Sequence, residues 1–164
     1  MRVLPIALRP LRRQASIFVN ECLGGSKPAN VKRYQVDEKY YRKVLQDIRD
    51  HGFNLAYISG EPGKNFKRSL QIAKEVGFPR GYMLQVYGST STRLQKVRTV
   101  LPFMRSRSIG PVYIYAADEP NSYGHLKSFL RDWKNYQREN ILTVTTLKGQ
   151  FAEELADVVD VTVY

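Results

Sequence analysis

The sequence predicts an α/β fold, in which short strands alternate with amphipathic helices along a chain of 164 residues. Apolar runs of strand length, rich in β-branched and aromatic residues, recur along the chain. Helical patterns with one apolar stripe separate these runs. The repeated strand–helix order implies parallel strands joined by right-handed crossovers. The expected strands are 15–23, 53–60, 81–88, 110–120, 141–146 and 158–164.

The first predicted helix spans residues 36–52 and follows a loop rich in Gly, Ser and Pro. Tyr41, Leu45 and Ile48 fall at helical spacing and form one apolar stripe. Asp37 is a suitable N-cap, and a glycine closes the segment. We therefore expect this helix to pack one face against the sheet.

Two further helices are predicted at 62–77 and 89–107, each after a predicted strand. Their apolar stripes consist of Phe66, Leu70, Ala73 and Val76 in the former, and Leu94, Val97 and Leu101 in the latter. A glycine ends the former, and Pro102 is expected to kink or end the latter.

A fourth helix is predicted at 122–140, and a short helix at 149–158 precedes the last strand. The residues on one face of the fourth helix are Leu126, Phe129, Leu130, Trp133 and Tyr136. A face of that size needs a substantial core to cover it.

Two architectures fit this order of elements: an open doubly wound sheet, and a (β/α)8 barrel with its last two units missing. Neither glycine-rich nucleotide fingerprint is present. Polar and aromatic residues gather at the carboxyl ends of several predicted strands, where barrel enzymes have their active sites. They are Asn20, Glu21, Ser59, Glu61, Tyr87, Asp118, Glu119, Asn121, Thr145 and Thr146. We predict an incomplete TIM-barrel-like domain of about six βα units over 14–164, after a basic segment at 1–13.

Composition narrows the classes of protein further. Apolar residues make up 43% of the chain, enough for a core, and the formal net charge is +11. The Lys and Arg residues, such as Arg93 and Lys96, are spread along the predicted helices and read as solvated faces, so nucleic-acid binding stays a lesser alternative. Cys22 is the only cysteine, which excludes an intrachain disulfide. No apolar run is long enough to span a membrane, and the basic opening does not read as a signal peptide.

Asp118 and Glu119 are adjacent where the predicted strand 110–120 ends. Glycoside hydrolysis needs one protonated acid beside the leaving oxygen and a second group that stabilises the charged centre. Pro120 forces a change of direction here, so both acids are able to converge on one pocket, where repulsion keeps one of them protonated. The alternative is structural, because the same residues suit a turn and a helix start.

Three stretches carry a resemblance to a known family: "DHGFNLAYISG", "GYMLQVYG" and above all "YIYAADEPN". They resemble the catalytic barrel of glycoside hydrolase family 123 and its relatives, which have a His-Gly pair closing an early helix and an Asp-Glu pair after the fourth strand. The resemblance covers roughly residues 14–164. It implies a (β/α)8 barrel that hydrolyses a β-linked N-acetylhexosaminide.

The resemblance also implies a substrate-assisted mechanism, in which the 2-acetamido oxygen of the sugar attacks the anomeric carbon. Glu119 then serves as the general acid/base, and Asp118 orients the acetamido group and stabilises its charge. The candidate substrate-binding residues are Tyr57, Tyr87, Tyr115, Asn121 and Glu21. Ordinary packing is the alternative role for the tyrosines, and for Tyr115 above all. The expected partner is a carbohydrate, with neither a metal nor another cofactor.

Two other functions remain open on these residues. One is a catalytically inactive domain of the same fold that binds glycan or another partner. The other is a basic α/β protein that binds nucleic acid. A barrel that ends at the sixth predicted strand also leaves open edges, through which the chain is able to self-associate.

Overall fold

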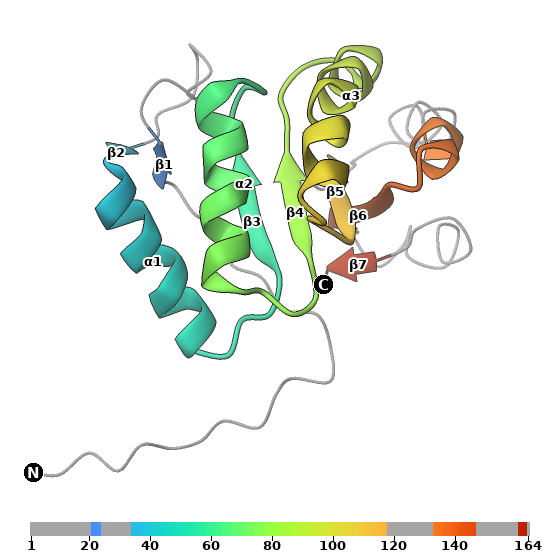
Figure 1. Ribbon diagram of the computed structural model, residues 1–164. Helices are drawn as coiled ribbons and strands as arrows, with labels where there is room; N and C mark the ends of the chain where they lie inside the picture. The colour runs from blue at the N-terminus through green and yellow to red at the C-terminus, as the bar shows by residue number, and fades with distance from the viewer. Residues whose placement is uncertain (1–20, 24–33, 118–132, 147–160, 164) are drawn as a thin grey trace, which may run out of the picture.

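A computed structural model describes residues 21–23, 34–117, 133–146 and 161–163. The predicted segments 1–13, 122–132 and 149–158 lie outside the described residues. The α/β class is confirmed, because helices alternate with the strands of a parallel sheet (Figure 1).

The main sheet has five strands in the order of the chain. They are β3 (Ala56–Ser59), β4 (Tyr82–Gln85), β5 (Val112–Ala117), β6 (Leu142–Thr146) and β7 (Val161–Val163). All neighbouring pairs are parallel. A doubly wound sheet reverses its strand order at a switch point. The described strands have no such reversal, so this architecture does not apply to them.

A second, two-stranded sheet pairs β1 (Glu21–Leu23) with β2 (Tyr34–Val36) in parallel. The strand β2 was not predicted, and Val36 was assigned to the start of the first helix. Three residues are too few for a periodic signal, although Tyr and Val both favour strands. Hydrogen bonds join β1 to β2, whereas the main sheet begins at β3.

The first helix, α1 (Glu38–Asp50), begins and packs as its sequence predicts. The Oδ1 atom of Asp37 accepts a hydrogen bond of 2.7 Å from the backbone N–H of Tyr40. Tyr41 and Leu45 are 2% and 0% exposed, and Ile48 packs against the same core.

Helices α2 (Lys64–Val76) and α3 (Thr90–Ser106) cover one face of the sheet (Figure 1). Their predicted apolar stripes are buried. Gly77 ends α2 with φ +86°, a conformation that glycine adopts without strain. By contrast, α3 does not end at Pro102 but continues to Ser106. Pro102 is exposed, so water can solvate the carbonyl group that loses its intrahelical partner.

Side-chain alternation gives the main sheet two different faces. On the helix face, Ile58, Leu84 and Ile114 pack against α2 and α3 and are 0% exposed. The opposite face, here called the tyrosine face, forms a separate buried cluster. Its members are Leu55, Tyr57, Met83, Tyr113, Tyr115 and Val144.

The fourth predicted helix is described only at residues 133–140, of which 133–138 are helical. Trp133 and Tyr136 are each 2% exposed, as their place on the predicted apolar face requires. Among the described residues, no helix combines the length and apolarity needed to cross a membrane.

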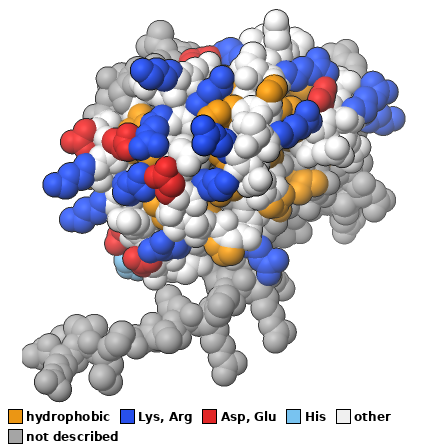
Figure 2. Space-filling view, in the orientation of Figure 1, with side chains coloured by type: hydrophobic (Ala, Val, Ile, Leu, Met, Phe, Trp, Pro, Cys, Tyr) orange, Lys and Arg blue, Asp and Glu red, His pale blue; other side chains and the backbone are white. Residues whose placement is uncertain are grey.

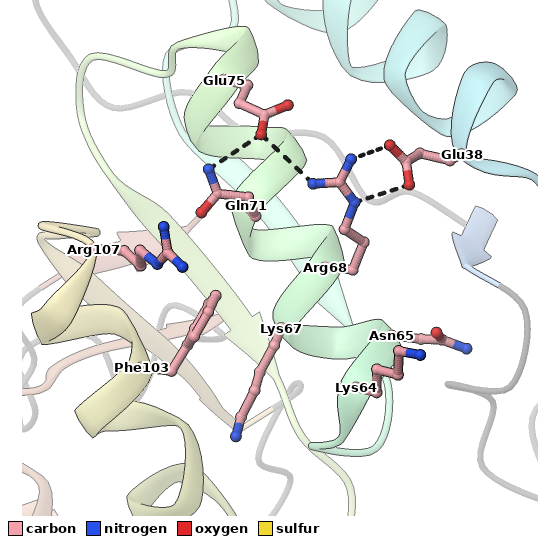
Figure 3. A pocket seen from close by; sticks show the side chains of 9 residues that line it. All are labelled: Glu38, Lys64, Asn65, Lys67, Arg68, Gln71, Glu75, Phe103 and Arg107. Carbon is pink, nitrogen blue, oxygen red and sulfur yellow. Dashed lines mark hydrogen bonds and ion pairs between the residues drawn. The ribbon is translucent and has the colours of Figure 1, made fainter.

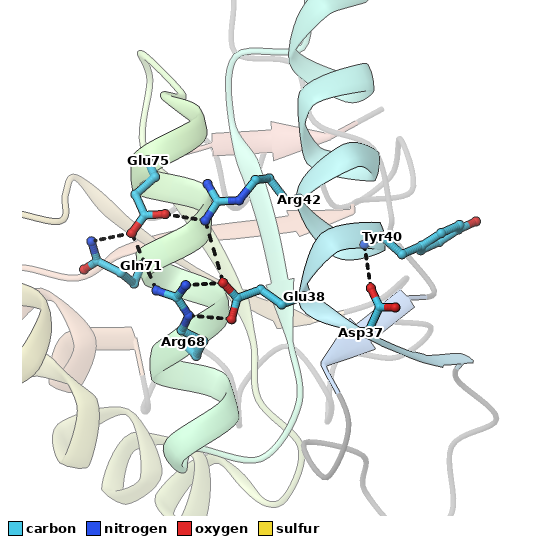
Figure 4. A network of polar contacts seen from close by, with 7 residues as sticks. All are labelled: Asp37, Glu38, Tyr40, Arg42, Arg68, Gln71 and Glu75. Atoms are coloured by element: carbon cyan, nitrogen blue, oxygen red, sulfur yellow. Dashed lines mark hydrogen bonds and ion pairs between the residues drawn. The ribbon is translucent and has the colours of Figure 1, made fainter.

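A network of charged side chains joins α1 to α2 (Figure 4). Arg68 donates hydrogen bonds to both carboxylate oxygens of Glu38. Arg42 donates one of 2.5 Å to Glu75. The hydrogen bond from Arg68 lowers the pKa of Glu38, and that from Arg42 lowers the pKa of Glu75. At neutral pH both acids are therefore ionised, and the positive charges of the two arginines balance their negative charges.

Candidate active site

Because all strands of the main sheet are parallel, their carboxyl ends lie at one edge. Polar side chains from β3, β4, β5 and the first turns of α3 meet there. We call this group the carboxyl-edge site. Its described members are Tyr57, Ser59, Glu61, Gln85, Tyr87, Arg93, Lys96 and Tyr115.

Gln85 joins two of the predicted tyrosines. The hydroxyl of Tyr57, on β3, donates a hydrogen bond to the Oε1 atom of Gln85, on β4. The hydroxyl of Tyr87 donates to the same oxygen over 2.9 Å. One amide oxygen thus holds both phenols, which fixes the orientation of the Gln85 side chain and of the half-buried Tyr87 ring.

Lys96 and Arg93 bring two cations from α3 to the same edge. The Nζ atom of Lys96 lies 2.6 Å from the Oε2 atom of Glu61 and donates a hydrogen bond of 3.0 Å to the carbonyl oxygen of Tyr87. Arg93 donates one of 3.5 Å to the carbonyl oxygen of Tyr115. These contacts tie α3 to the ends of β3, β4 and β5. The side chains of Lys96 and Glu61 are partly exposed to solvent, so their ion pair adds little to the free energy of unfolding.

Ser59 is the last residue of β3 and is only 7% exposed. Its register partner is Gln85. Its Oγ atom is buried and has no hydrogen-bond partner among the described residues. A buried hydroxyl without a partner is unfavourable.

The structure brings together some of the predicted site residues. Tyr57 and Tyr87 meet at Gln85, and Tyr115 shares the tyrosine face with Tyr57. Tyr57 and Tyr115 are 2% and 4% exposed, so their rings pack in the core and the packing role fits both. Of the three tyrosines, Tyr87 keeps a ring that is partly open to solvent.

The remaining predicted residues are not brought to this site by the described part of the chain. The acids Asp118 and Glu119, together with Asn121, lie outside the described residues. Glu21 lies in β1, opposite Tyr34 of β2, and therefore in the smaller sheet.

Sequence reasoning missed Gln85 and misjudged Arg93 and Lys96. Gln85 is a polar residue within a strand that is otherwise apolar, which is a usable signal for a side chain with a specific partner. Arg93 and Lys96 were assigned to solvated helix faces, but they are half-buried and contact strand ends. Their place in the first two turns of a helix that follows a strand is the signal that was available.

The described ranges contain no group of three or more His, Cys, Asp or Glu side chains arranged to hold a metal ion. No family model, curated protein or solved structure matches this chain.

Proposed function

We propose that this chain is a glycoside hydrolase-like domain that acts on a β-linked N-acetylhexosaminide by substrate-assisted, retaining hydrolysis. One observation carries the proposal. The middle strand of the main sheet, β5, ends at Ala117, and Asp118 and Glu119 follow it directly in the sequence. In the sequence, the acids therefore come directly after the strand that pairs with β4, whose last residue is Gln85.

The proposal includes a barrel-like architecture for the main sheet. Right-handed crossovers between parallel strands in chain order put the connecting helices α2 and α3 on the same face of the main sheet, whereas Val44 and Ile48 of α1 contact the tyrosine face. The tyrosine face is then the inner face, as in a barrel whose interior is filled by layers of side chains. Tyr57, Met83 and Tyr113 are register partners across three strands and form such a layer.

The proposed chemistry divides between the acids and the described residues. Glu119 protonates the leaving oxygen and later activates water, while Asp118 orients the acetamido group that attacks the anomeric carbon. The ring of Tyr87, held by Gln85, offers an apolar face to the sugar. The hydroxyl of Ser59 offers a hydrogen bond to a sugar hydroxyl.

A glycan-binding domain without catalysis is the second candidate for the same edge. The observation that favours it is the state of Glu61, the one acid described at the carboxyl-edge site, which is paired with Lys96. The described part of the site therefore offers hydrogen-bonding groups and an aromatic ring but no free acid.

Hydrolysis of β-N-acetylgalactosaminides and β-N-acetylglucosaminides tests the proposal. We expect Glu119→Gln to lower kcat on a disaccharide by about 10²–10⁴-fold, because an alkoxide leaving group needs protonation. The loss is smaller on a nitrophenyl glycoside, whose leaving group needs little help. Asp118→Asn lowers kcat on both substrates, and the exposed Asp47→Asn on α1 is the matched control.

The acetamido requirement separates this mechanism from others. The corresponding β-galactoside and β-glucoside, which lack the acetamido group, are expected to remain uncleaved. Binding of the N-acetyl sugars without hydrolysis by the unaltered protein supports the second candidate and rejects the first. An activity that survives both acid substitutions rejects the assignment of the residues.

A further inference from the structure

A groove of about 690 Å³ lies on the outer surface of the helices, between α2 and α3 (Figure 3). We call it the α2–α3 groove. Its walls come mainly from α2 and from the last turn of α3, and Glu38 of α1 closes one side. Its lining residues are Glu38, Lys64, Asn65, Lys67, Arg68, Gln71, Glu75, Phe103 and Arg107.

The acids of this groove already have partners. Glu38 and Glu75 are held by Arg68 and Arg42 in the network that joins α1 to α2 (Figure 4). That network contains two acids and two arginines, so it contributes no net charge.

The remaining cations of the groove have no acidic partner within the described part of the chain. They are Lys64, Lys67 and Arg107. Lys67 lies over the ring of Phe103, with 5.9 Å between its Nζ atom and the ring centroid. The groove thus presents three uncompensated positive charges beside one aromatic ring.

The surface around the groove has the same sign. Helix α3 contains Arg93, Lys96, Arg98 and Arg105 and no acidic residue, and two of these cations pair with acids outside the helix, Lys96 with Glu61 and Arg98 with Glu139. Lys and Arg side chains are spread over the helical face in Figure 2, with few acidic side chains among them. A surface of this kind attracts a polyanion from a distance.

We propose that the α2–α3 groove binds single-stranded nucleic acid, with Lys64, Lys67 and Arg107 contacting phosphates and Phe103 stacking on a base. A basic groove with an aromatic platform is the usual arrangement in proteins that bind single strands. The groove follows α2, whose 13 residues span about 20 Å, enough for a few nucleotides.

Two other polyanionic partners fit the surface less well. Duplex DNA is read by a helix or ribbon that enters the major groove, whereas the feature here is a concavity between two helices. A membrane surface takes up large apolar side chains as well as cations. Tyr40 on α1 is the one large hydrophobic residue exposed among the described residues, and it does not line the groove.

The test measures binding of a labelled 12-nucleotide oligouridylate by fluorescence anisotropy between 50 and 200 mM KCl. Three phosphate contacts predict a slope of about −2 for the logarithm of the association constant against that of the salt concentration. We expect the triple variant Lys64→Gln/Lys67→Gln/Arg107→Gln to bind at least tenfold more weakly at 100 mM KCl, with a slope near zero. Phe103→Leu is expected to weaken binding about tenfold without changing the slope.

The matched control is the triple variant Lys39→Gln/Lys43→Gln/Lys134→Gln, which has the same net charge but leaves the groove intact. It should change the affinity less than twofold. An equal loss in this control overturns the assignment of the groove, as does the absence of binding by the unaltered protein. Tighter binding of a 12-base-pair duplex, or binding to phosphatidylserine vesicles alone, rejects a single-stranded ligand. These readouts do not involve sugar cleavage, so they are independent of the function proposed for the carboxyl-edge site.

Discussion

At the scale of single residues, Gly81 shows how closely neighbouring strands approach. Its φ is +116°, and a Cβ atom at this position would lie 2.4 Å from the carbonyl oxygen of Pro111. The same oxygen accepts a hydrogen bond of 3.0 Å from the N–H of Tyr82, at the start of β4. The glycine therefore lets β4 and β5 begin in register.

Replacing Gly81 by alanine should accordingly destabilise the protein strongly. Backbone strain alone costs roughly 1–3 kcal/mol, and the required displacement of Pro111 adds to it. Gly77→Ala is the control, because its φ is +86° but no atom lies within 4 Å of the added Cβ, so only strain remains. Urea unfolding followed by the fluorescence of Trp133, the only tryptophan, measures both. Equal losses in the two variants would refute the steric explanation.

The buried hydroxyl of Ser59 gives a second prediction at this scale. Ser59→Ala removes no hydrogen bond among the described residues, so we expect a change in unfolding free energy within about 1 kcal/mol. The same variant should weaken binding of the N-acetyl sugar several-fold, as measured by calorimetry. Tyr57→Phe is the comparison, since it breaks the bond to Gln85 and should cost about 1 kcal/mol. A marked loss of stability in Ser59→Ala with unchanged sugar binding would make the hydroxyl structural.

Single residues were also where prediction from the sequence was least complete. Tyr57 and Tyr87 were identified from their positions near strand ends, but the residue that joins them, Gln85, was not. A hydrogen bond between neighbouring strands depends on register, and register follows from pairing across 28 positions of the chain. A local sequence pattern covers only residues that are close together in the chain. It therefore cannot identify hydrogen-bond partners on strands that are far apart in the sequence.

At the scale of elements, the helices were predicted well because their signals are local. The apolar stripes of α1, α2 and α3 repeat with helical period over about two to three turns, and caps or glycines mark helix ends. The strand β2 was missed because three residues carry no period. The predicted range of the third helix, 89–107, is confirmed by α3. Of the two effects expected of Pro102, a kink or an end, the structure excludes the end, because that residue is exposed and the helix is held by its buried stripe.

The contact between α1 and α2 gives a prediction for pH dependence. The pKa values of Glu38 and Glu75 are lowered in the folded protein by their arginine partners. A lowered carboxyl pKa stabilises the folded state above the unfolded pKa of about 4.5, and this contribution is lost as the pH falls through the folded value. We expect the urea midpoint to fall between pH 7 and pH 3, and this fall to be smaller in Arg68→Gln.

Because these side chains are partly exposed, the difference between the protein and Arg68→Gln should be small and should shrink in 1 M salt. Arg80→Gln, at an exposed arginine with no ion pair among the described residues, is the control and should retain the full pH effect. An identical pH profile for all three proteins would show that the network adds nothing to stability.

At the scale of the whole molecule, the sequence predicted the α/β class, because strand and helix patterns alternate along it. It did not predict the order of the strands in the sheet. Both an open doubly wound sheet and a barrel-like sheet have the same local patterns. The two architectures differ in the order of the strands in the sheet. In the described main sheet this order is the same as the order along the chain. Ser59, Glu61 and Tyr87 were predicted at the carboxyl ends because parallel strands share an edge in either architecture.

That order of strands also bears on how the protein can be assembled. Each inner strand of the main sheet, β4, β5 and β6, pairs with the strand made just before it and the strand made just after it. A ribosome delivers the chain in that same direction, so from β4 onward each nascent strand meets a partner that has already left the exit tunnel. Synthesis and sheet growth therefore run in step, and no strand has to wait for a distant segment before it can pair.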